Sequence, residues 1–188
     1  MFGSVRHDAW AHSGARLLPV TQVLAGILVA TALQLAVEPA SAQASCQVSD
    51  LAAPSRRLLD CGGGFRIEFE PSVRIRASAR AGERPPRAVE LDGGGALIEV
   101  VPGSLATQIR TPHAIAAVRG TVYAVDVSPD MTSVLVVRGI VEVRKATGED
   151  RSVRLGPGQG VDVSAETPLT VKTWPVARAA RLLARLGR

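Results

Sequence analysis

Alternation of apolar and polar side chains is the strongest pattern in this sequence, and it predicts short β-strands rather than helices. In Phe65–Phe69, Arg66 and Glu68 separate three apolar residues, as in a strand with one buried face. Similar runs recur along the chain between turns rich in glycine, proline and aspartate. The predicted strands are Phe65–Phe69, Val73–Arg76, Ala88–Leu91, Ala96–Val101, Ser133–Val137, Ile140–Lys145, Ser152–Leu155, Val161–Val163 and Leu169–Lys172, with the long apolar run Ala114–Val127. Almost no helical pattern lies between them, so the predicted fold class is all-β.

The spacing of glycines refines this prediction. Gly120, Gly139 and Gly160 each stand at the start of a short β-rich run, at spacings of 19 and 21 residues. A repeat of about 20 residues is typical of stacked coils, so the sequence favours a β-solenoid or roll. An antiparallel β-sandwich has similar turn spacing and is the alternative.

Residues 174–188 form the one clear helical pattern, a basic amphipathic helix in which Pro175 suits the first turn. The favoured interpretation is a terminal helix laid across one end of the β core, because so short a helix needs packing to be stable. The alternative is weak contact with an anionic membrane surface or a partner. The predicted apolar stripe is Val176, Ala179, Ala180, Leu183 and Leu186, with Arg178, Arg181 and Arg185 off it and in solvent.

The first 44 residues are typical of a secretory signal peptide. Arg6 and Arg16 precede the apolar run Leu17–Val37, and Ala-Gln-Ala at 42–44 predicts cleavage after Ala44. The apolar run is also about long enough to cross a bilayer, so an inner-membrane anchor over 17–37 is the alternative.

The chain has two cysteines, Cys46 and Cys61, just after this leader. In an oxidising compartment such a pair usually forms a disulfide. The pair lacks the C-x-x-C spacing and the neighbouring ligands of a metal or redox site. We therefore expect a disulfide-tied N-terminal segment at 45–61, followed by a β domain at 62–173 and the helix at 174–188.

Charge and motifs exclude two function classes. The formal net charge is +5, but the arginines alternate with acids along the strands and no basic patch is interleaved with aromatics, so nucleic-acid binding is not expected. His113 is the single histidine after the leader, and no G-x-S-x-G motif occurs. The glycine-rich stretch 156–160 is not followed by a helix, so it is no phosphate cradle. We expect no enzyme activity, cofactor or metal.

Four stretches in the second half of the chain resemble the FecR domain family. They are Thr111-Pro112, then Arg119-Gly120-Thr121, then Arg138-Gly139 before a Val-rich strand, and finally Leu155 to Gln159. The resemblance is strong over about 107–163 and looser from residue 62. Arg138, where the family commonly has an acid, and Pro157 are the departures. The motif positions, which form a possible partner surface, are Thr111, Pro112, Arg119, Gly120, Thr121, Gly139, Gly158 and Gln159.

Arg119 has two interpretations. In one it lies in the apolar run and either extends its guanidinium to solvent or pairs with an acid such as Asp126 or Glu142. In the other it belongs to the partner surface.

The resemblance implies a periplasmic module. The best-known FecR proteins are inner-membrane regulators with a cytoplasmic domain that binds an alternative sigma factor, while the FecR domain senses an iron-siderophore transporter. Only 16 residues precede the apolar run here, so we expect no such cytoplasmic domain and no anti-sigma activity.

The expected function is an exported, non-catalytic protein-binding module with a signalling or scaffolding role in the envelope. The alternatives are a membrane-anchored regulator of iron-siderophore uptake and a glycan- or envelope-binding structural module. Few aromatics follow the leader, which argues against sugar stacking. Partner capture by strand addition is expected at an edge near Gln108–Pro112.

Overall fold

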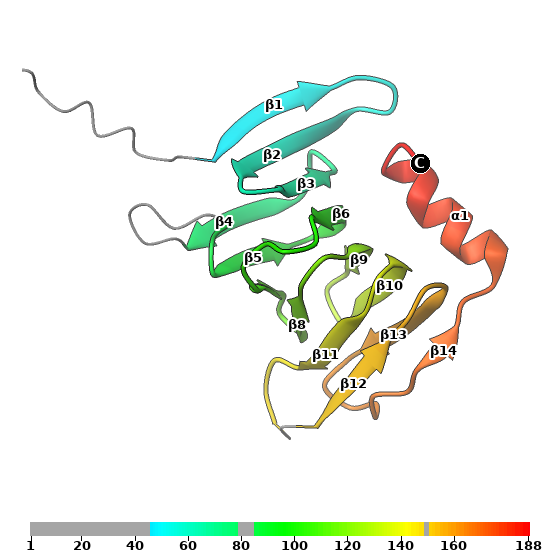
Figure 1. Ribbon diagram of the computed structural model, residues 1–188. Coiled ribbons are helices and arrows are strands. Elements are labelled where there is room, and N and C mark those ends of the chain that lie inside the picture. Colours follow the sequence, from blue (N-terminus) through cyan, green and yellow to red (C-terminus); the bar gives the residue numbers. More distant parts are fainter. Residues whose placement is uncertain (1–45, 79–84, 149–150) are drawn as a thin grey trace, which may run out of the picture. The chain divides into compact units, whose positions relative to one another are not determined.

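The computed structural model describes residues 46–78, 85–148 and 151–188. The strands of these residues form two sheets that pack on each other, and one helix follows at the C-terminal end (Figure 1). The signal peptide predicted over 1–44 lies outside the described residues. Sheet A contains, in spatial order, β1 (Gln47–Leu51), β2 (Arg56–Gly62), β3 (Phe65–Phe69), β6 (Gly94–Val100), β9 (Val122–Val127), β10 (Thr132–Arg138), β13 (Gln159–Val163) and β14 (Lys172–Thr173). Sheet B contains β12 (Ser152–Leu155), β11 (Val141–Lys145), β8 (Ala114–Val118), β7 (Thr107–Arg110), β5 (Ala88–Asp92) and β4 (Arg74–Ser78).

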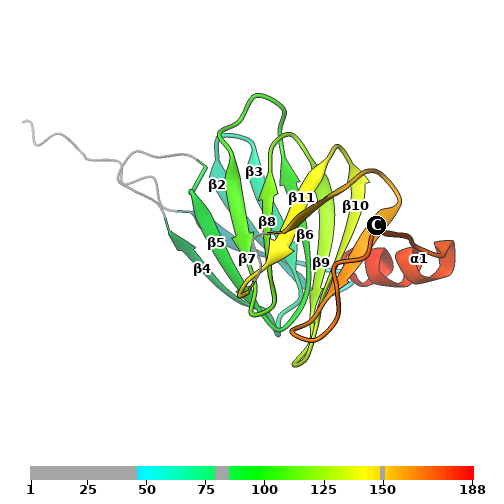
Figure 2. The ribbon, with the colours of Figure 1, turned by 90° about the horizontal axis from the view of Figure 1, so that it is seen from below.

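The core lies between the two sheets and is built mainly from aliphatic side chains (Figure 2). Phe65 and Ile67 of β3 are fully buried, whereas Arg66 between them is exposed, which confirms the alternation predicted for this strand. Sheet B contributes its own alternate residues, such as Val141 and Val143. Alternation along each strand therefore gives each sheet one apolar face, and the two apolar faces meet.

The strand pairing corresponds to the sandwich rather than to the favoured solenoid. Neighbouring strands pair antiparallel, except for β5 with β7, which are parallel. Stacked coils would instead pair their strands in parallel, coil upon coil, and that pattern is not seen in the described strands.

The glycine spacing has another origin. Gly120 and Gly139 lie where the chain crosses from one sheet to the other, and Gly160 lies in β13 beneath the ring of Trp174. The interval of about 20 residues is the length of a pair of strands with its connections, so it recurs in a sandwich as well as in a solenoid.

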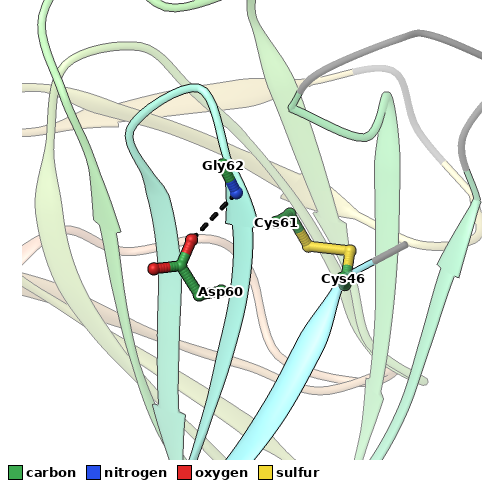
Figure 3. The surroundings of a disulfide bond; sticks show 4 residues. All are labelled: Cys46, Asp60, Cys61 and Gly62. Atoms are coloured by element: carbon green, nitrogen blue, oxygen red, sulfur yellow. Dashed lines mark hydrogen bonds between the residues drawn. A yellow bond between two sulfur atoms is a disulfide. The ribbon is translucent and has the colours of Figure 1, made fainter. Parts of the chain in front are cut away.

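The segment before Phe65 is a β-hairpin, β1 with β2, in the disulfide-tied segment for which no strands are predicted from the sequence. Four of the five residues of β1 are exposed, so the strand lacks the alternating pattern that would have identified it. Cys46 and Cys61 form the predicted disulfide, which joins the start of this hairpin to its end (Figure 3). Asp60 accepts a hydrogen bond from the backbone N–H of Gly62 at 2.8 Å and shapes the turn into β3.

The edge proposed near Gln108–Pro112 is not an edge. β7 lies inside sheet B, hydrogen-bonded to β5 on one side and to β8 on the other. Strand addition at β7 is therefore wrong, because its backbone groups already have partners. The outermost strands of sheet B are β4 and β12.

The C-terminal helix, α1 (Val176–Arg185), packs on the outer face of sheet A. It makes a second, smaller apolar cluster, in which Leu182 and Leu186 contact residues of β6, β9 and β10. The predicted stripe was only partly right, since Val176 is 85% exposed and Leu182, left off it, is 4% exposed. The face towards the sheet is Arg178, Leu182, Arg185 and Leu186, at i, i+4, i+7 and i+8.

Two arginines of α1 fix the rotation of the helix about its own axis, because their carboxylate partners lie on sheet A. Arg178 makes two hydrogen bonds to Asp162, at 2.6 and 3.0 Å, and stacks on Trp174 with 3.6 Å from its guanidinium carbon to the ring centroid. Arg185 binds Glu70 at 2.7 and 2.9 Å and Asp126 at 3.0 Å. The expectation that the arginines point into solvent is therefore wrong for Arg178 and Arg185, whereas Arg181 is exposed as expected. The helix's membrane contact has no support in this packing.

These pairs make the attachment of α1 dependent on pH. The hydrogen bond from Arg178 lowers the pKa of Asp162 below its ordinary value, against the opposing effect of burial. Arg185 lowers the pKa of Glu70 in the same way. Each carboxylate binds its proton more weakly in the folded state, so its contribution to stability is complete above its ordinary pKa and disappears as the pH falls through the lowered pKa.

Replacement of both cysteines with serine is expected to lower the free energy of unfolding by about 3 kcal/mol, because the unfolded chain regains the entropy of a loop of about 15 residues. Urea unfolding followed by circular dichroism measures this difference. The wild-type protein treated with reductant serves as the control and should match the double variant. Equal stability of the oxidised and reduced proteins would contradict this assignment of the disulfide's role.

Asp162→Asn is expected to destabilise the attachment of α1 by about 1 kcal/mol, since a charged hydrogen bond is lost at a partly exposed site. Below about pH 4 the difference from wild type should shrink, because the wild-type carboxylate is then being protonated. The chemical shift of the Trp174 indole N–H, followed by NMR in a pH titration, reports the attachment. Asp130→Asn, at an exposed turn, should leave the titration unchanged. A pH-independent difference between wild type and Asp162→Asn would refute the role of this ion pair.

Candidate functional site

One end of the sandwich gathers the connections that carry most of the motif residues. We call it the crossover end and define it as residues 101–105, 119–121, 137–140 and 156–158. The chain crosses between the sheets in each of these four connections, from β6 to β7, β8 to β9, β10 to β11 and β12 to β13. The candidate site is thus built by four segments that are distant in sequence.

The turn Arg119-Gly120-Thr121 lies at the centre of this end. Gly120 has φ +66°, and a methyl group on it would lie 3.1 Å from the Cα of Pro102. Thr121 is fully buried, and its carbonyl accepts a hydrogen bond from the N–H of Val100 at 2.8 Å. These two residues therefore hold the turn against the neighbouring connection, with Gly120 half-buried and Thr121 fully buried.

Arg119 is exposed and has no ion-pair partner among the described residues, so its expected pairing with an acid is wrong. Asp126, one proposed partner, binds Arg185 instead. Glu142, the other, lies on the outer side of β11. A side chain in a turn at the end of both sheets lies outside the layer between them, which explains its exposure.

The turn at Gly139 is interlocked with the turn at Gly120. Gly139 has φ +89°, and a methyl group on it would lie 2.8 Å from Cγ2 of Thr121 and 2.9 Å from the carbonyl oxygen of Gly120. Only a residue without Cβ allows the two backbones to approach this closely. The flanking residues Arg138 and Ile140 project outward and are exposed.

Gly158 and Gln159 also have structural roles. The side-chain oxygen of Gln159 accepts a hydrogen bond from the N–H of Gly156 at 2.8 Å, which closes the turn. Gly158 donates to the carbonyl of Val136 at 2.9 Å and accepts from the N–H of Trp174 at 3.0 Å. This motif thereby links the turn to β10 and to the residue that leads into α1.

Thr111 and Pro112 lie at the opposite end, so the structure divides the predicted motif set. The hydroxyl of Thr111 accepts from the N–H of Ala114 at 2.9 Å and lies 2.9 Å from the hydroxyl of Thr132. His113 contacts the same hydroxyl through Nδ1 at 3.1 Å and the carbonyl of Pro129 through Nε2 at 3.2 Å. These contacts join the β7–β8 turn of sheet B to the β9–β10 turn of sheet A, and they account for His113 as a structural residue.

Exposed apolar side chains concentrate at the crossover end. Of the six large hydrophobic residues that are exposed in the described parts of the chain, Val101, Leu105, Val137 and Ile140 belong to it. Arg119 and Arg138 stand among them, and neither forms an ion pair with any described residue. An exposed apolar patch with unpaired cations is typical of a surface that binds another molecule.

Sequence reasoning missed the apolar members of this surface. Val101 and Ile140 were assigned to strands, and Leu105 was given no role. Their neighbours Pro102, Gly103 and Gly139 were the available signal, since an apolar residue beside a turn residue at a sheet's end faces solvent.

Side chains suited to metal binding are not grouped in the described part of the chain. No three His, Cys, Asp or Glu residues there are placed to hold a metal ion. Tyr123 is enclosed in the core, and burial raises the pKa of its hydroxyl well above the ordinary value. Within the described ranges, no helix has the length and apolar character needed to cross a membrane.

Comparison with known proteins agrees with the motif analysis. The FecR protein family model matches residues 51–142, so the match starts upstream of the predicted domain and ends before Gly158 and Gln159. No curated protein matches the sequence.

Two crystal structures of a proposed anti-sigma factor from Parabacteroides distasonis ATCC 8503 have a similar fold. Their TM-scores are 0.53 and 0.52, at 19% and 18% sequence identity. In both comparisons the alignment covers 73% of this chain and 60% of the other. At this identity the likeness concerns the fold alone.

Three observations lead to one assignment. They are the β-sandwich, its interlocked turns at Arg119-Gly120-Thr121 and Gly139, and the family match over 51–142. The disulfide agrees with a compartment outside the cytoplasm. Residues 51–142 of this chain form a FecR domain.

Proposed function

We propose that this protein is an exported, non-catalytic FecR module that binds a protein partner in the periplasm through its crossover end. The observation that carries the proposal is the cluster of Val101, Leu105 and Ile140 around the unpaired Arg119 and Arg138. Apolar side chains supply the area that a partner buries, and the arginines select for acidic groups on it. The interlocked glycine turns keep this surface in one conformation, so little entropy is lost on binding.

The proposed route to the periplasm is cleavage of the signal peptide after Ala44. The alternative is an inner-membrane protein anchored by Leu17–Val37, which would act as a regulator of iron-siderophore uptake. The structural neighbours are described as anti-sigma factors, and this favours a signalling role over a purely structural one.

A glycan-binding role has less support. The aromatic side chains available for stacking on a sugar are buried, with Phe65 and Tyr123 in the main core and Trp174 against α1. A sugar site needs such rings at the surface.

A photo-crosslinking residue at position 140 is expected to capture one envelope protein in intact cells, whereas the same residue at position 130, on the opposite end, should not. In the Arg119→Glu, Arg138→Glu double variant the capture at 140 should fall at least about tenfold, since two favourable charges become repulsive. Western blotting of the fractionated crosslinks measures both effects.

Recovery of the captured species in the soluble periplasm, with an N-terminus near Ser45, would agree with cleavage. A full-length species in the inner membrane would favour the anchored regulator. Equal crosslinking from positions 130 and 140 would refute the crossover end as the partner surface.

Gly139→Ala is expected to destabilise the protein by about 2 kcal/mol or more, because the methyl group meets Thr121 and the backbone of Gly120 at a positive φ. Gly148→Ala is the matched control, with φ +93° but open space around the position. Thermal unfolding of both variants separates the cost of packing from the cost of the backbone conformation. If Gly148→Ala destabilised the protein as much as Gly139→Ala, the contact between the two turns would add nothing to stability beyond the effect of the backbone conformation.

A further inference from the structure

The two sheets end unevenly on the side of β4. The chain passes from β3 to β4 through a tight turn, in which Val73 donates to the carbonyl of Glu70 at 3.0 Å. Beyond β3, sheet A continues with β2 and β1, but sheet B ends at β4. On the other side the sheets match better, because β12 of sheet B contacts β13 of sheet A. In the described structure, β1 and the adjoining part of β2 therefore have no strand opposite them.

Side chains that a further strand would cover are exposed. Val48 of β1 pairs in register with Leu59 of β2, so both point towards the core side, yet Val48 is 49% exposed and Leu59 only 5%. On β4, Ala77 pairs with the fully buried Val89 and is itself exposed. Ile75, on the same side of β4, is only partly buried. The inward sides of β1 and β4 thus face an incompletely filled layer.

Within the described residues, the outer edge of β4 has unpaired backbone groups. Among the described strands, β4 is hydrogen-bonded to β5 alone, and Figure 2 shows it at the margin of its sheet. It is five residues long and contains no proline. Such an edge can bind an extended segment, which adds a strand to the sheet.

We propose that the edge of β4 binds, by strand addition, an extended segment of another protein in which acidic residues alternate with apolar ones. One face of the added strand lies next to Ile75 and Ala77, beneath β1, and takes apolar side chains. The other face lies next to Arg74 and Arg76, which point outward from β4. Strand periodicity places alternate residues on these two faces, and this requires the alternating pattern.

The preference for acids follows from the charges around β4. Arg74 is paired with Asp92, whereas Arg76 has no ion-pair partner among the described residues. Both arginines border a hollow of about 310 Å³, whose lining also includes Arg110 and the carboxylates of Glu90 and Asp92. An added acidic residue therefore gains an unpaired arginine as its cross-strand neighbour.

A second copy of this chain is a poorer occupant. Antiparallel pairing of two β4 strands would bring Arg74 and Arg76 of one copy next to the same residues of the other. Like charges directly opposite each other destabilise a sheet, so this edge selects against self-association.

The inference is independent of the crossover end, and the two surfaces can be tested separately. The probe is a fluorescent eight-residue peptide with blocked ends in which Asp and Val alternate. Its controls are a peptide of the same composition with four Asp followed by four Val, and an alternating Lys–Val peptide. Fluorescence anisotropy with the purified protein should give at least about tenfold tighter binding for the alternating acidic peptide than for either control.

Charge reversal tests the role of the edge arginine. Arg76→Glu should weaken binding of the Asp–Val peptide at least about tenfold and give measurable binding of the Lys–Val peptide. Because Arg76 is exposed, the variant is expected to fold normally. Arg154→Glu, on the exposed face of β12 and outside both proposed surfaces, is the matched control and should leave peptide binding unchanged. Loss of binding in both variants alike would overturn the assignment to β4.

Backbone methylation tests strand addition itself. In an added strand, alternate N–H groups point towards β4 and the others point away. Methylation of the first set should abolish binding, and methylation of the second should leave it intact. The proposal would be overturned if methylation of the two sets had equal effects. It would also be overturned if the alternating peptide did not bind, or if it bound no more tightly than the peptide with four Asp followed by four Val. If the protein dimerised without peptide and Arg76→Glu changed that dimerisation, the occupant of the β4 edge would be a second copy of this chain, and the proposal would be overturned.

Discussion

The close approach of the turns at Gly120 and Gly139 is the constraint on which the sandwich depends. Two sheets share a core only if the chain passes between them within a few residues, and at this end the connections from β8 to β9 and from β10 to β11 do so side by side. Val118 and Val141, which pair next to these turns, are both buried. Because the turns lie directly at the end of the core, the residues that close the core also position the exposed arginines and apolar side chains around them.

Ion pairs hold α1 on the outer face of sheet A, whereas apolar packing holds sheet B on its inner face. Glu70, Asp126 and Asp162 come from distant parts of the chain and would leave this face acidic. α1 brings Arg178 and Arg185 to them, and its leucines fill the space between. The helix is therefore held by directional pairs around a small apolar contact, whereas the outer face of sheet B has no helix over it in the described structure.

The sequence predicted well where a pattern depends on neighbouring residues alone. Alternation identified β3 and its buried face, and cysteine count identified the disulfide. It failed where the answer depends on partners far along the chain. β7 lies inside its sheet because it pairs with β5, and no residue pattern within Gln108–Pro112 predicts that pairing. The rotation of α1 was misjudged for the same reason, because arginines on a helix look solvated until their carboxylate partners are known. Arg119 was misplaced because an apolar run does not show where it is folded into a turn.

The ion pair between Arg185 and Glu70 joins residues separated by 115 positions in the chain, and Arg188 reaches Glu68 across 120. Contacts of such long range raise the contact order and slow folding, since the entropy of closing a large loop must be lost before they form. When a chain emerges from its N-terminus first, these carboxylates appear long before the arginines that cover them. The packing on the outer face of sheet A is thus completed only after α1 has emerged, so the docking of α1 is a late step of folding.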